Sequence, residues 1–315
     1  MDQKTVLSYG EVLWDLLPNG AVLGGAPCNF AFRMHSLGNR SVMVSRLGND
    51  HFGSKARDIL AKLGMPLEGL QTEEVLPTGT VQVEFDENQS PDYEIIENVA
   101  YDNIKPNPNL ESLAQSTHAI CFGTLAQRRP ASRDTLYWLL DLIPSNAIKI
   151  CDINLRKNCY DQGIVEKSLR QANILKLSDE ETGILSSWFK MDPNDLKKLG
   201  QQLVDQWNLD CCLITLGAKG ALAFDHTENI LYQPGFKIKL KDPVGAGDSC
   251  TAGFIHRYLN GAALSDCCRT GCGLGAMVAT QSGATERIIP EDLDAFIQSN
   301  QRFEMDPRFE DLVSS

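Results

Sequence analysis

A glycine-rich turn followed by an acid, at residues 242–254 (DPVGAGDSCTAGF), has the residue types needed to hold and transfer an anionic group. Gly245, Ala246 and Gly247 leave the backbone without side-chain bulk where a helix is expected to begin. Their N–H groups can converge on one anion, helped by the positive end of the helix dipole. Asp248 follows, where its carboxylate could accept a proton from an attacking hydroxyl. The stretch predicts phosphoryl transfer, although the same residues could simply turn the chain and cap the helix.

The position of Asp248 also predicts its protonation state. At a helix N-terminus the carboxylate is expected to stay ionised, which makes it a weak base. In a loose, metaphosphate-like transition state the proton leaves late, so a weak base is sufficient.

Composition and missing motifs argue against several other classes of protein. The 315 residues include 29 basic and 41 acidic ones, a net charge of −12, which argues against sequence-independent nucleic-acid binding and against binding to an anionic membrane surface. No run of about 18 apolar residues or signal-peptide core is present, so we expect a cytoplasmic protein. The ten cysteines lack a C-x-x-C pair, which indicates reduced, buried thiols. The P-loop pattern and the G-x-S-x-G elbow are also absent.

Strand-like and helix-like segments alternate along most of the chain, which is typical of a parallel, doubly wound sheet. The expected strands of this sheet are residues 5–9, 41–47, 118–122, 148–152, 173–177 and 211–215. We therefore expect one α/β domain over residues 1–315, with a mainly parallel sheet flanked by helices.

A hairpin interrupts this alternation. Residues 80–86 alternate between polar and apolar types, and a polar turn leads back into residues 93–99. Because the hairpin has one apolar face, it must cover another surface. We expect a small β lid formed by about residues 12–23 and 78–105, or a subunit contact; a surface hairpin packed on its own domain is the alternative.

Polar residues follow several expected strands, at the edge of the sheet where open α/β folds bind ligands. Asp15 could accept hydrogen bonds from two neighbouring sugar hydroxyls, and Asn29, in the segment 24–31 (GGAPCNFA), suits a polyol. Arg156 could meet a transferring phosphoryl group, and Glu181, or a water that it holds, could meet a metal ion. A solvated loop acid at Asp15 and capping of the helix after residue 178 are the ordinary alternatives.

Two separated segments resemble the signatures of the ribokinase-like (PfkB) carbohydrate kinases. Residues 24–31, with Gly38 and Gly48 downstream, resemble the N-terminal signature, and residues 242–255 resemble the C-terminal one. Within that family, the chain is most similar to the bacterial and plant fructokinase branch, through its motifs at residues 10–15, 26–27, 100–102 and 152–156. The resemblance implies a ribokinase-like fold and the reaction of ATP with D-fructose to give fructose 6-phosphate.

The resemblance also implies roles for individual residues. Asp248 would be the base, beside an anion hole at residues 245–247. The positions that match the sugar site are Asp15, Gly25, Asn29 and Arg156. The positions that match the nucleotide and phosphate site are Thr215, Gly217, Gly220 and Ser178, the last standing where the family usually has the asparagine of an Asn-x-x-Glu motif. Glu181 would serve Mg²⁺, and Asp242 with the carbonyl of Val244 resembles a monovalent-cation site for K⁺ that some members use.

Alternatives to fructose phosphorylation stay open at this point. The acceptor could be 2-keto-3-deoxygluconate, ribose or a nucleoside, because the side chains of the lid decide specificity. A protein of another class, a catalytically inactive sugar-binding regulator, could use the same scaffold. The implied partners are a sugar and ATP, without nucleic acid or membrane, and the resemblance also implies dimerisation through the lid.

Overall fold

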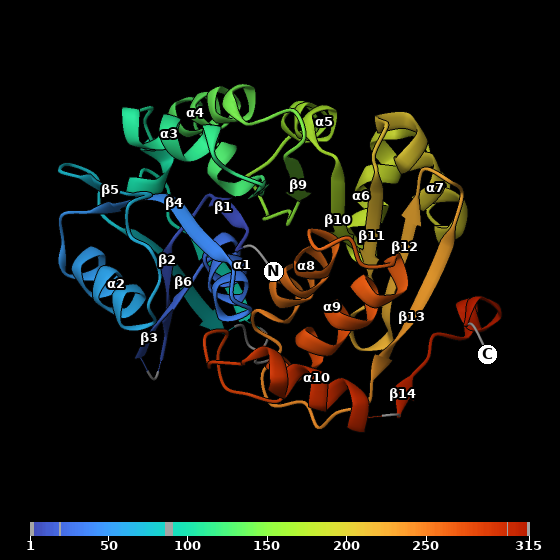
Figure 1. Ribbon diagram of the computed structural model, residues 1–315. Helices are drawn as coiled ribbons and strands as arrows, with labels where there is room; N and C mark the ends of the chain where they lie inside the picture. The colour runs from blue at the N-terminus through green and yellow to red at the C-terminus, as the bar shows by residue number, and fades with distance from the viewer. Residues whose placement is uncertain (1–2, 19, 86–90, 301, 314–315) are drawn as a thin grey trace.

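The computed structural model of the protein describes residues 3–18, 20–85, 91–300 and 302–313 (Figure 1). Two sheets and the helices around them make up this part of the chain. The polar turn expected at residues 87–90 lies outside the described residues.

A large sheet forms the centre of the molecule, with the strand order β14-β13-β12-β11-β10-β9-β8-β1-β4-β5. Neighbouring strands from β5 to β11 run parallel, and those from β11 to β14 run antiparallel. The mainly parallel sheet predicted from the sequence is therefore confirmed. Its strands are β1 (Thr5–Tyr9), β4 (Arg40–Gly48), β5 (Leu70–Glu73), β8 (Ala119–Phe122), β9 (Ile148–Asp152), β10 (Ile174–Ser178), β11 (Cys211–Thr215), β12 (Gly220–Asp225), β13 (Ile230–Phe236) and β14 (Phe303–Glu304).

Helices cover both faces of this sheet (Figure 1). Val6 and Leu7, adjacent in β1, contribute to the two different hydrophobic clusters, because successive side chains of a strand point to opposite faces. One face carries α3 (Pro108–Gln115), α4 (Pro130–Leu142), α5 (Gln162–Gln171), α6 (Asp179–Phe189) and α7 (Leu196–Trp207). The other carries α1 (Ala26–Ser36), α8 (Ala246–Tyr258), α9 (Leu264–Ala279) and α10 (Pro290–Ser299).

A small sheet, with the order β3-β2-β6-β7, stands beside the large one. It consists of β2 (Leu13–Leu17), β3 (Gly20–Gly24), β6 (Gly79–Phe85) and β7 (Pro91–Ile95). Two hairpins that are distant in the sequence are joined by the parallel pairing of β2 with β6. A third hydrophobic cluster packs β2 and β3 against α1, β4 and α2 (His51–Lys62), so the sheet is anchored on the same side as the N-terminal helix α1.

Helices α8 and α9 pack closely against each other, which positions the first turns of α8. A Cβ at Gly271 would lie 2.7 Å from the carbonyl oxygen of Cys250, and one at Gly275 would lie 2.8 Å from that of Ala246. The small residues of both helices thus allow the backbones to approach closely. The first turns of α8 are therefore held against the backbone of α9.

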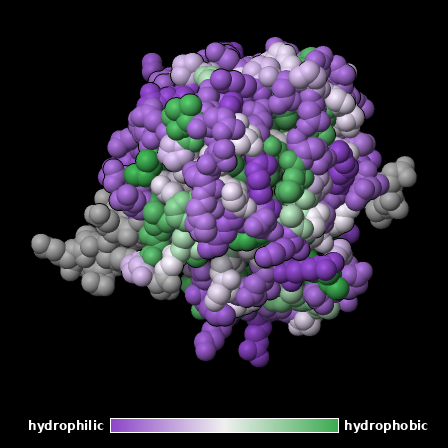
Figure 2. Space-filling model, turned by 90° about the vertical axis from the view of Figure 1, so that its left-hand side faces the viewer, coloured by the Kyte–Doolittle hydropathy of each residue, from purple (hydrophilic) through white to green (hydrophobic). Residues whose placement is uncertain are grey.

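The cysteines lie in the interior of the protein as free thiols. All ten cysteines are buried and none forms a disulfide. In the described residues, no helix has the length and apolar character needed to cross a membrane. The face turned to the viewer in Figure 2 is mainly hydrophilic, with hydrophobic side chains gathered in patches; the exposed large hydrophobic residues of the molecule include Val22 of β3 and Val75.

Candidate active site

Asp248 lies in the first turn of α8 and contacts helix α1. The Nδ2 group of Asn29 donates a hydrogen bond to Oδ2 of Asp248 at 2.8 Å, across 219 positions of sequence. The turn before Asp248 requires glycine at position 245: its φ is 75°, and a Cβ there would lie 2.4 Å from that of Ala284. Two of the residues predicted for the site are therefore in direct contact.

The environment of Asp248 makes it a stronger base than the sequence suggested. Removal from water and, to a smaller extent, the charge of Asp152 raise the pKa of this carboxyl, which is about 6 as the net result of all its surroundings. The hydrogen bond from Asn29 and the charges of Lys176 and Arg156 act in the opposite direction. The expected effect of the helix end is outweighed because the carboxylate is surrounded by protein and faces a second acid.

The predicted anion hole is the N-terminus of α8. Gly245 is the N-cap residue, and Ala246 and Gly247 begin the helix. The N–H of Ala246 donates to the carbonyl oxygen of Pro243 at 3.1 Å, so this amide closes the turn. A helix N-terminus without bulky side chains suits an anion.

Asp15, Gly25 and Asn29 lie on the side of the small sheet and α1. Asp15 is in β2, and its Oδ2 would be 2.7 Å from a Cβ at Gly24, so glycine leaves room for this carboxylate. Gly25, the N-cap of α1, has φ 106°, and a Cβ there would lie 2.5 Å from the carbonyl oxygen of Glu11. The Oδ1 atom of Asn29 is buried and has no partner among the described residues. It is available to accept a hydrogen bond from a hydroxyl group.

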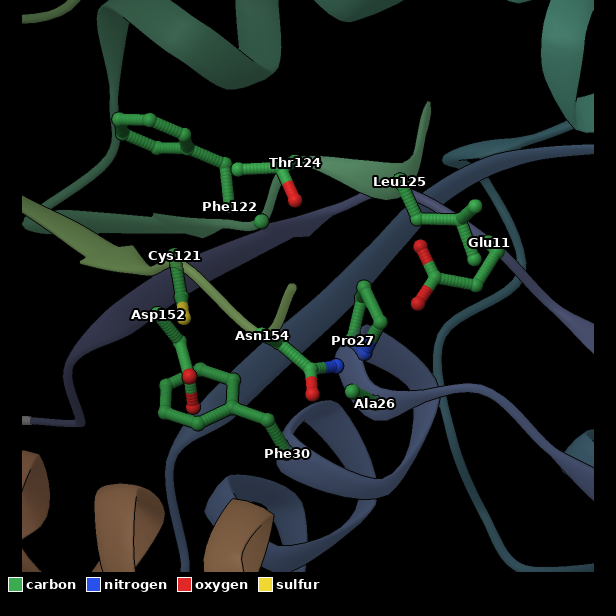
Figure 3. A pocket seen from close by; sticks show the side chains of 11 residues that line it. Glu11, Ala26, Pro27, Phe30, Cys121, Phe122, Thr124, Leu125, Asp152 and Asn154 are labelled. Carbon is green, nitrogen blue, oxygen red and sulfur yellow. The ribbon is translucent and has the colours of Figure 1, made fainter. Parts of the chain in front are cut away.

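Glu11 is an acid that the sequence analysis did not place in the site. Figure 3 shows Glu11 and Asn154 beside a cavity that is also lined by Ala26, Pro27, Phe30, Cys121, Phe122, Gly123, Thr124, Leu125 and Asp152. Glu11 is 4% exposed, and burial raises its pKa to about 7. Its position directly after the carboxyl end of β1 was the available signal.

Arg156 supplies positive charge to this side of the molecule. It is an exposed residue in the loop after β9. Its charge lowers the pKa of Glu11, Asp15 and Asp248 against the larger raising effect of burial on each. The guanidinium is thus near enough to all three acids to influence their pKa values.

The residues predicted for the nucleotide lie at the carboxyl ends of β10 and β11, which are neighbours in the large sheet. Thr215 ends β11, and its hydroxyl donates to the carbonyl oxygen of Leu177 at 3.3 Å. Gly217 and Gly220 follow with φ of 57° and 98°, values that favour glycine. Ser178 ends β10 and is the N-cap of α6.

Ser178 and Glu181 form a capping box, the ordinary role considered for this motif. Oε2 of Glu181 accepts from the N–H of Ser178 at 2.7 Å, and Oε1 accepts from the N–H of Leu155 at 2.6 Å. No cluster of three or more acidic, histidine or cysteine ligands that could hold a metal occurs in the part of the chain that is described. Because both oxygens already accept a backbone hydrogen bond, Glu181 fits Mg²⁺ held through water better than direct coordination.

Asp242 braces the loop before α8. Its Oδ1 accepts from the N–H of Val244 and its Oδ2 from the N–H of Gly283, each at 3.0 Å. The carboxylate therefore joins the loop before α8, which includes both residues that resemble a monovalent-cation site, to the segment at Gly283.

The sequence as a whole is similar to carbohydrate kinases. Residues 19–292 match the model of the pfkB family of carbohydrate kinases. A putative sugar kinase of Pyrococcus horikoshii is 28% identical over 267 residues, covering 79% of this chain and 81% of that protein. Fructokinase-2 of Solanum lycopersicum is 26% identical over 307 residues, covering 89% of this chain and 91% of that protein.

Solved structures of fructokinases share the fold. The structure of a fructokinase from Xylella fastidiosa with bound ATP superposes with a TM-score of 0.82 at 22% identity, covering 95% of this chain and 99% of the other. The structure of a fructokinase from Vibrio cholerae with fructose, ADP and calcium ion has a TM-score of 0.79 at 24% identity, with coverages of 94% and 99%.

Proposed function

Because this chain belongs to the pfkB family of carbohydrate kinases, we propose that it transfers the γ-phosphoryl group of ATP to a primary hydroxyl of D-fructose, giving fructose 6-phosphate. The observation that carries the proposal is the 2.8 Å hydrogen bond from Asn29 to Asp248. It joins a residue suited to a sugar hydroxyl to a carboxylate at the N-terminus of α8. This contact supports the proposal that Asp248 is the base, that Asn29 binds the acceptor, and that the helix end beside them binds the phosphoryl group.

The chemistry of the site follows from these neighbours. The sugar, held by Asp15, Gly25 and Asn29, presents its hydroxyl to Asp248, which accepts the proton as the oxygen attacks phosphorus. The helix end at residues 245–247 and Arg156 stabilise the negative charge of the phosphoryl group. The bond from phosphorus to the bridging oxygen breaks, and ADP leaves.

ATP is assigned to the edge of the sheet formed by Thr215, Gly217, Gly220 and Ser178. Positive φ values at both glycines let the backbone approach a polyphosphate closely. Mg²⁺ bound with ATP would neutralise phosphate charge, and Glu181 would hold it through water. The carboxylate of Asp242 and the carbonyl of Val244 are the proposed ligands of K⁺.

The small sheet is proposed as a lid over the sugar. It contributes Asp15 directly, and its strand β3 leads into Gly25 at the start of α1. Closure of this sheet would exclude water and so suppress ATP hydrolysis. The same sheet is the proposed contact of a homodimer. We place the protein in the cytoplasm, as expected from its sequence.

Fructose is favoured over other acceptors by the similarity to fructokinases of tomato and of Vibrio cholerae. The Pyrococcus relative is described more broadly, as a putative sugar kinase, so the similarity also supports the wider acceptor class. The cavity beside Glu11 and Asn154 offers a carboxylate and an amide to sugar hydroxyls.

A coupled ADP-release assay tests the proposal. Mg-ATP is offered with fructose, ribose, glucose, mannose, 2-keto-3-deoxygluconate or adenosine, with and without K⁺, and Asp248→Ala is the control. We expect turnover that depends on fructose and Asp248, with fructose 6-phosphate as product. Turnover with another acceptor would show that the substrate assignment is wrong and would leave the proposed mechanism unchanged. Retained sugar binding without turnover on any acceptor would favour a regulatory sugar-binding protein.

A further inference from the structure

A lysine is buried beneath the anion-binding end of α8. Lys176 is in the middle of β10 and is 7% exposed. Its Nζ donates to Oδ1 of Asp152, on the adjacent strand β9, at 3.0 Å. An ammonium group removed from water is costly unless it is paired, so this ion pair needs a reason.

Asp152 is fixed from two sides. The hydroxyl of Thr251, one turn beyond Asp248 in α8, donates to Oδ2 of Asp152 at 3.0 Å and is also 3.1 Å from the carbonyl oxygen of Gly247. The hydrogen bonds thus run from β10 through β9 into the first turn of α8. They hold the lysine in one position relative to the helix end.

The ammonium group faces the helix end without an intervening side chain. A Cβ at Gly247 would lie 3.6 Å from Nζ of Lys176, so the lysine approaches the bare backbone of the turn. An ammonium has three N–H donors, and the contact with Asp152 uses one. Lys176 is also two residues before Ser178, at the edge assigned to the nucleotide. It therefore stands between the nucleotide side of the site and the base.

The charges around Lys176 keep it protonated. Burial acts to lower its pKa, but the carboxylates of Asp152, Glu181 and Asp248 together outweigh burial and raise it above the usual range. A permanent cation near these three acids would lower the electrostatic cost of bringing a phosphoryl group to them.

We propose that Lys176 is a catalytic residue whose ammonium contacts the phosphoryl group during transfer, and that Asp152 and Thr251 are the positioning residues that aim it. The inference rests on the proposed kinase function. As the sugar oxygen bonds to phosphorus and the bond to the ADP oxygen breaks, Lys176 stabilises the negative charge on the equatorial oxygens, while the hydroxyl proton goes to Asp248.

A merely structural role makes a different prediction: Lys176 would serve to neutralise Asp152. Three variants separate the two roles, namely Lys176→Met, Asp152→Asn and the double variant. We expect Lys176→Met to lower kcat about 100-fold, as removal of one transition-state donor does, with little change in the KM for the sugar. The double variant removes both charges, and we expect kcat to remain at least about tenfold below wild type. Recovery of the double variant to the wild-type kcat would overturn the proposal.

A binding measurement gives a second readout that needs no sugar. By calorimetry, we expect Lys176→Met to weaken the β,γ-imido analogue of ATP about tenfold, since a charge-assisted hydrogen bond is lost, and to leave ADP binding unchanged. Equal effects on both nucleotides, or no effect on either, would overturn the contact with the transferred group. Because this comparison of Lys176→Met with the wild type needs no acceptor, its result can be interpreted even if no sugar of the panel is phosphorylated.

Lys149→Met is the matched control, since Lys149 lies on the neighbouring strand β9 and is neither of the two residues that hold Asp152. Thermal unfolding of every variant shows whether the fold is kept. We expect Lys149→Met to retain wild-type kcat and analogue affinity; a loss equal to that of Lys176→Met would assign the effect to the strands rather than to the ammonium.

Discussion

The two polar atoms of the Asn29 amide have different surroundings. Its Nδ2 stabilises the carboxylate of Asp248 at 2.8 Å, while its buried Oδ1 has no partner among the described residues. A sugar hydroxyl that donates to Oδ1 would therefore satisfy a group that is otherwise costly to bury. We therefore expect the side chain of Asn29 both to bind the acceptor and to align the base.

Asp248→Asn should abolish most turnover while leaving the site intact. The amide keeps an oxygen that can accept from Asn29 but cannot take the proton of the attacking hydroxyl, so we expect kcat to fall about 10³-fold. Steady-state kinetics give kcat, and calorimetry with sugar should give an affinity near that of the wild type. Asp266→Asn, in the first turn of α9, is the control for loss of an exposed acid at a helix start. Near-wild-type turnover of Asp248→Asn would contradict its role as base.

The raised pKa of Asp248 predicts the pH dependence of the reaction. The carboxyl must be ionised to act as a base, and burial raises its pKa to about 6. We therefore expect kcat/KM to decrease as the pH falls through about 6, rather than near the usual value for aspartate of about 4. The acidic limb of the pH profile, in which kcat/KM decreases as the pH falls, measures this pKa.

Glu11 has to be separated from Asp248 in that profile, because burial raises the pKa of Glu11 to about 7. In Glu11→Gln the limb should remain near pH 6 if Asp248 is responsible. Disappearance of the limb in this variant would assign it to Glu11 instead.

At the scale of elements, the start of α8 is determined by what surrounds one glycine. Gly245 has a positive φ and would clash with Ala284 if it carried a Cβ, and Ala284 in turn accepts a hydrogen bond at its carbonyl from Arg33 of α1. This arginine is fully buried and also donates to the carbonyl of Glu286. Helix α1, the segment at 284–286 and the turn before α8 thus hold one another in place.

We expect Gly245→Ala to lower kcat by more than its loss of folding stability would explain. A positive φ costs alanine about 1 kcal/mol, and the contact with Ala284 adds displacement of the turn. Gly261 is a matched control, because its φ is 71° and a Cβ there would meet nothing within 4 Å. We expect both alanine variants to unfold more easily in denaturant, and only Gly245→Ala to lose at least about tenfold in kcat. Equal kcat values in the two variants would show that the turn geometry is unimportant.

At the scale of the whole molecule, the site lies where the two sheets meet. Asp15 comes from the small sheet, whereas Asp248 and Asn29 come from helices packed on the large one. Movement of the small sheet would therefore bring sugar-binding groups toward or away from the base.

Hydrogen exchange followed by mass spectrometry tests this movement. We expect sugar to slow amide exchange in β2 and β3, because lid closure reduces opening of those strands, and to leave α10 unchanged. We expect Asp15→Asn to weaken sugar binding and therefore to require higher sugar concentrations for the same protection. Protection that is equal in α10 and the small sheet would indicate general stabilisation by ligand rather than closure.

Several features of the fold and the site were determined by the sequence alone. The alternation of strands and helices is local, and it predicted the mainly parallel sheet. A glycine-rich turn is visible in the sequence because its residues are consecutive. The start of α8 and the segment before Asn29 could therefore be predicted from the sequence. Helix α1 begins at Ala26, earlier than the apolar run suggests, because Pro27 is tolerated in a first turn.

Tertiary structure decided the features that depend on partners far along the chain. Lys176 lies within the apolar strand 174–178, where the sequence gives no sign of a functional role. Its proposed role was inferred from its ion pair with Asp152 on the next strand and from the hydrogen bond of Thr251 on α8 to Asp152. Glu11 became part of the site because burial and a cavity surround it. The raised pKa of Asp248 likewise results from lost solvent and from Asp152. Local sequence specifies backbone conformation, whereas burial and charge pairing arise only when the separate segments pack together.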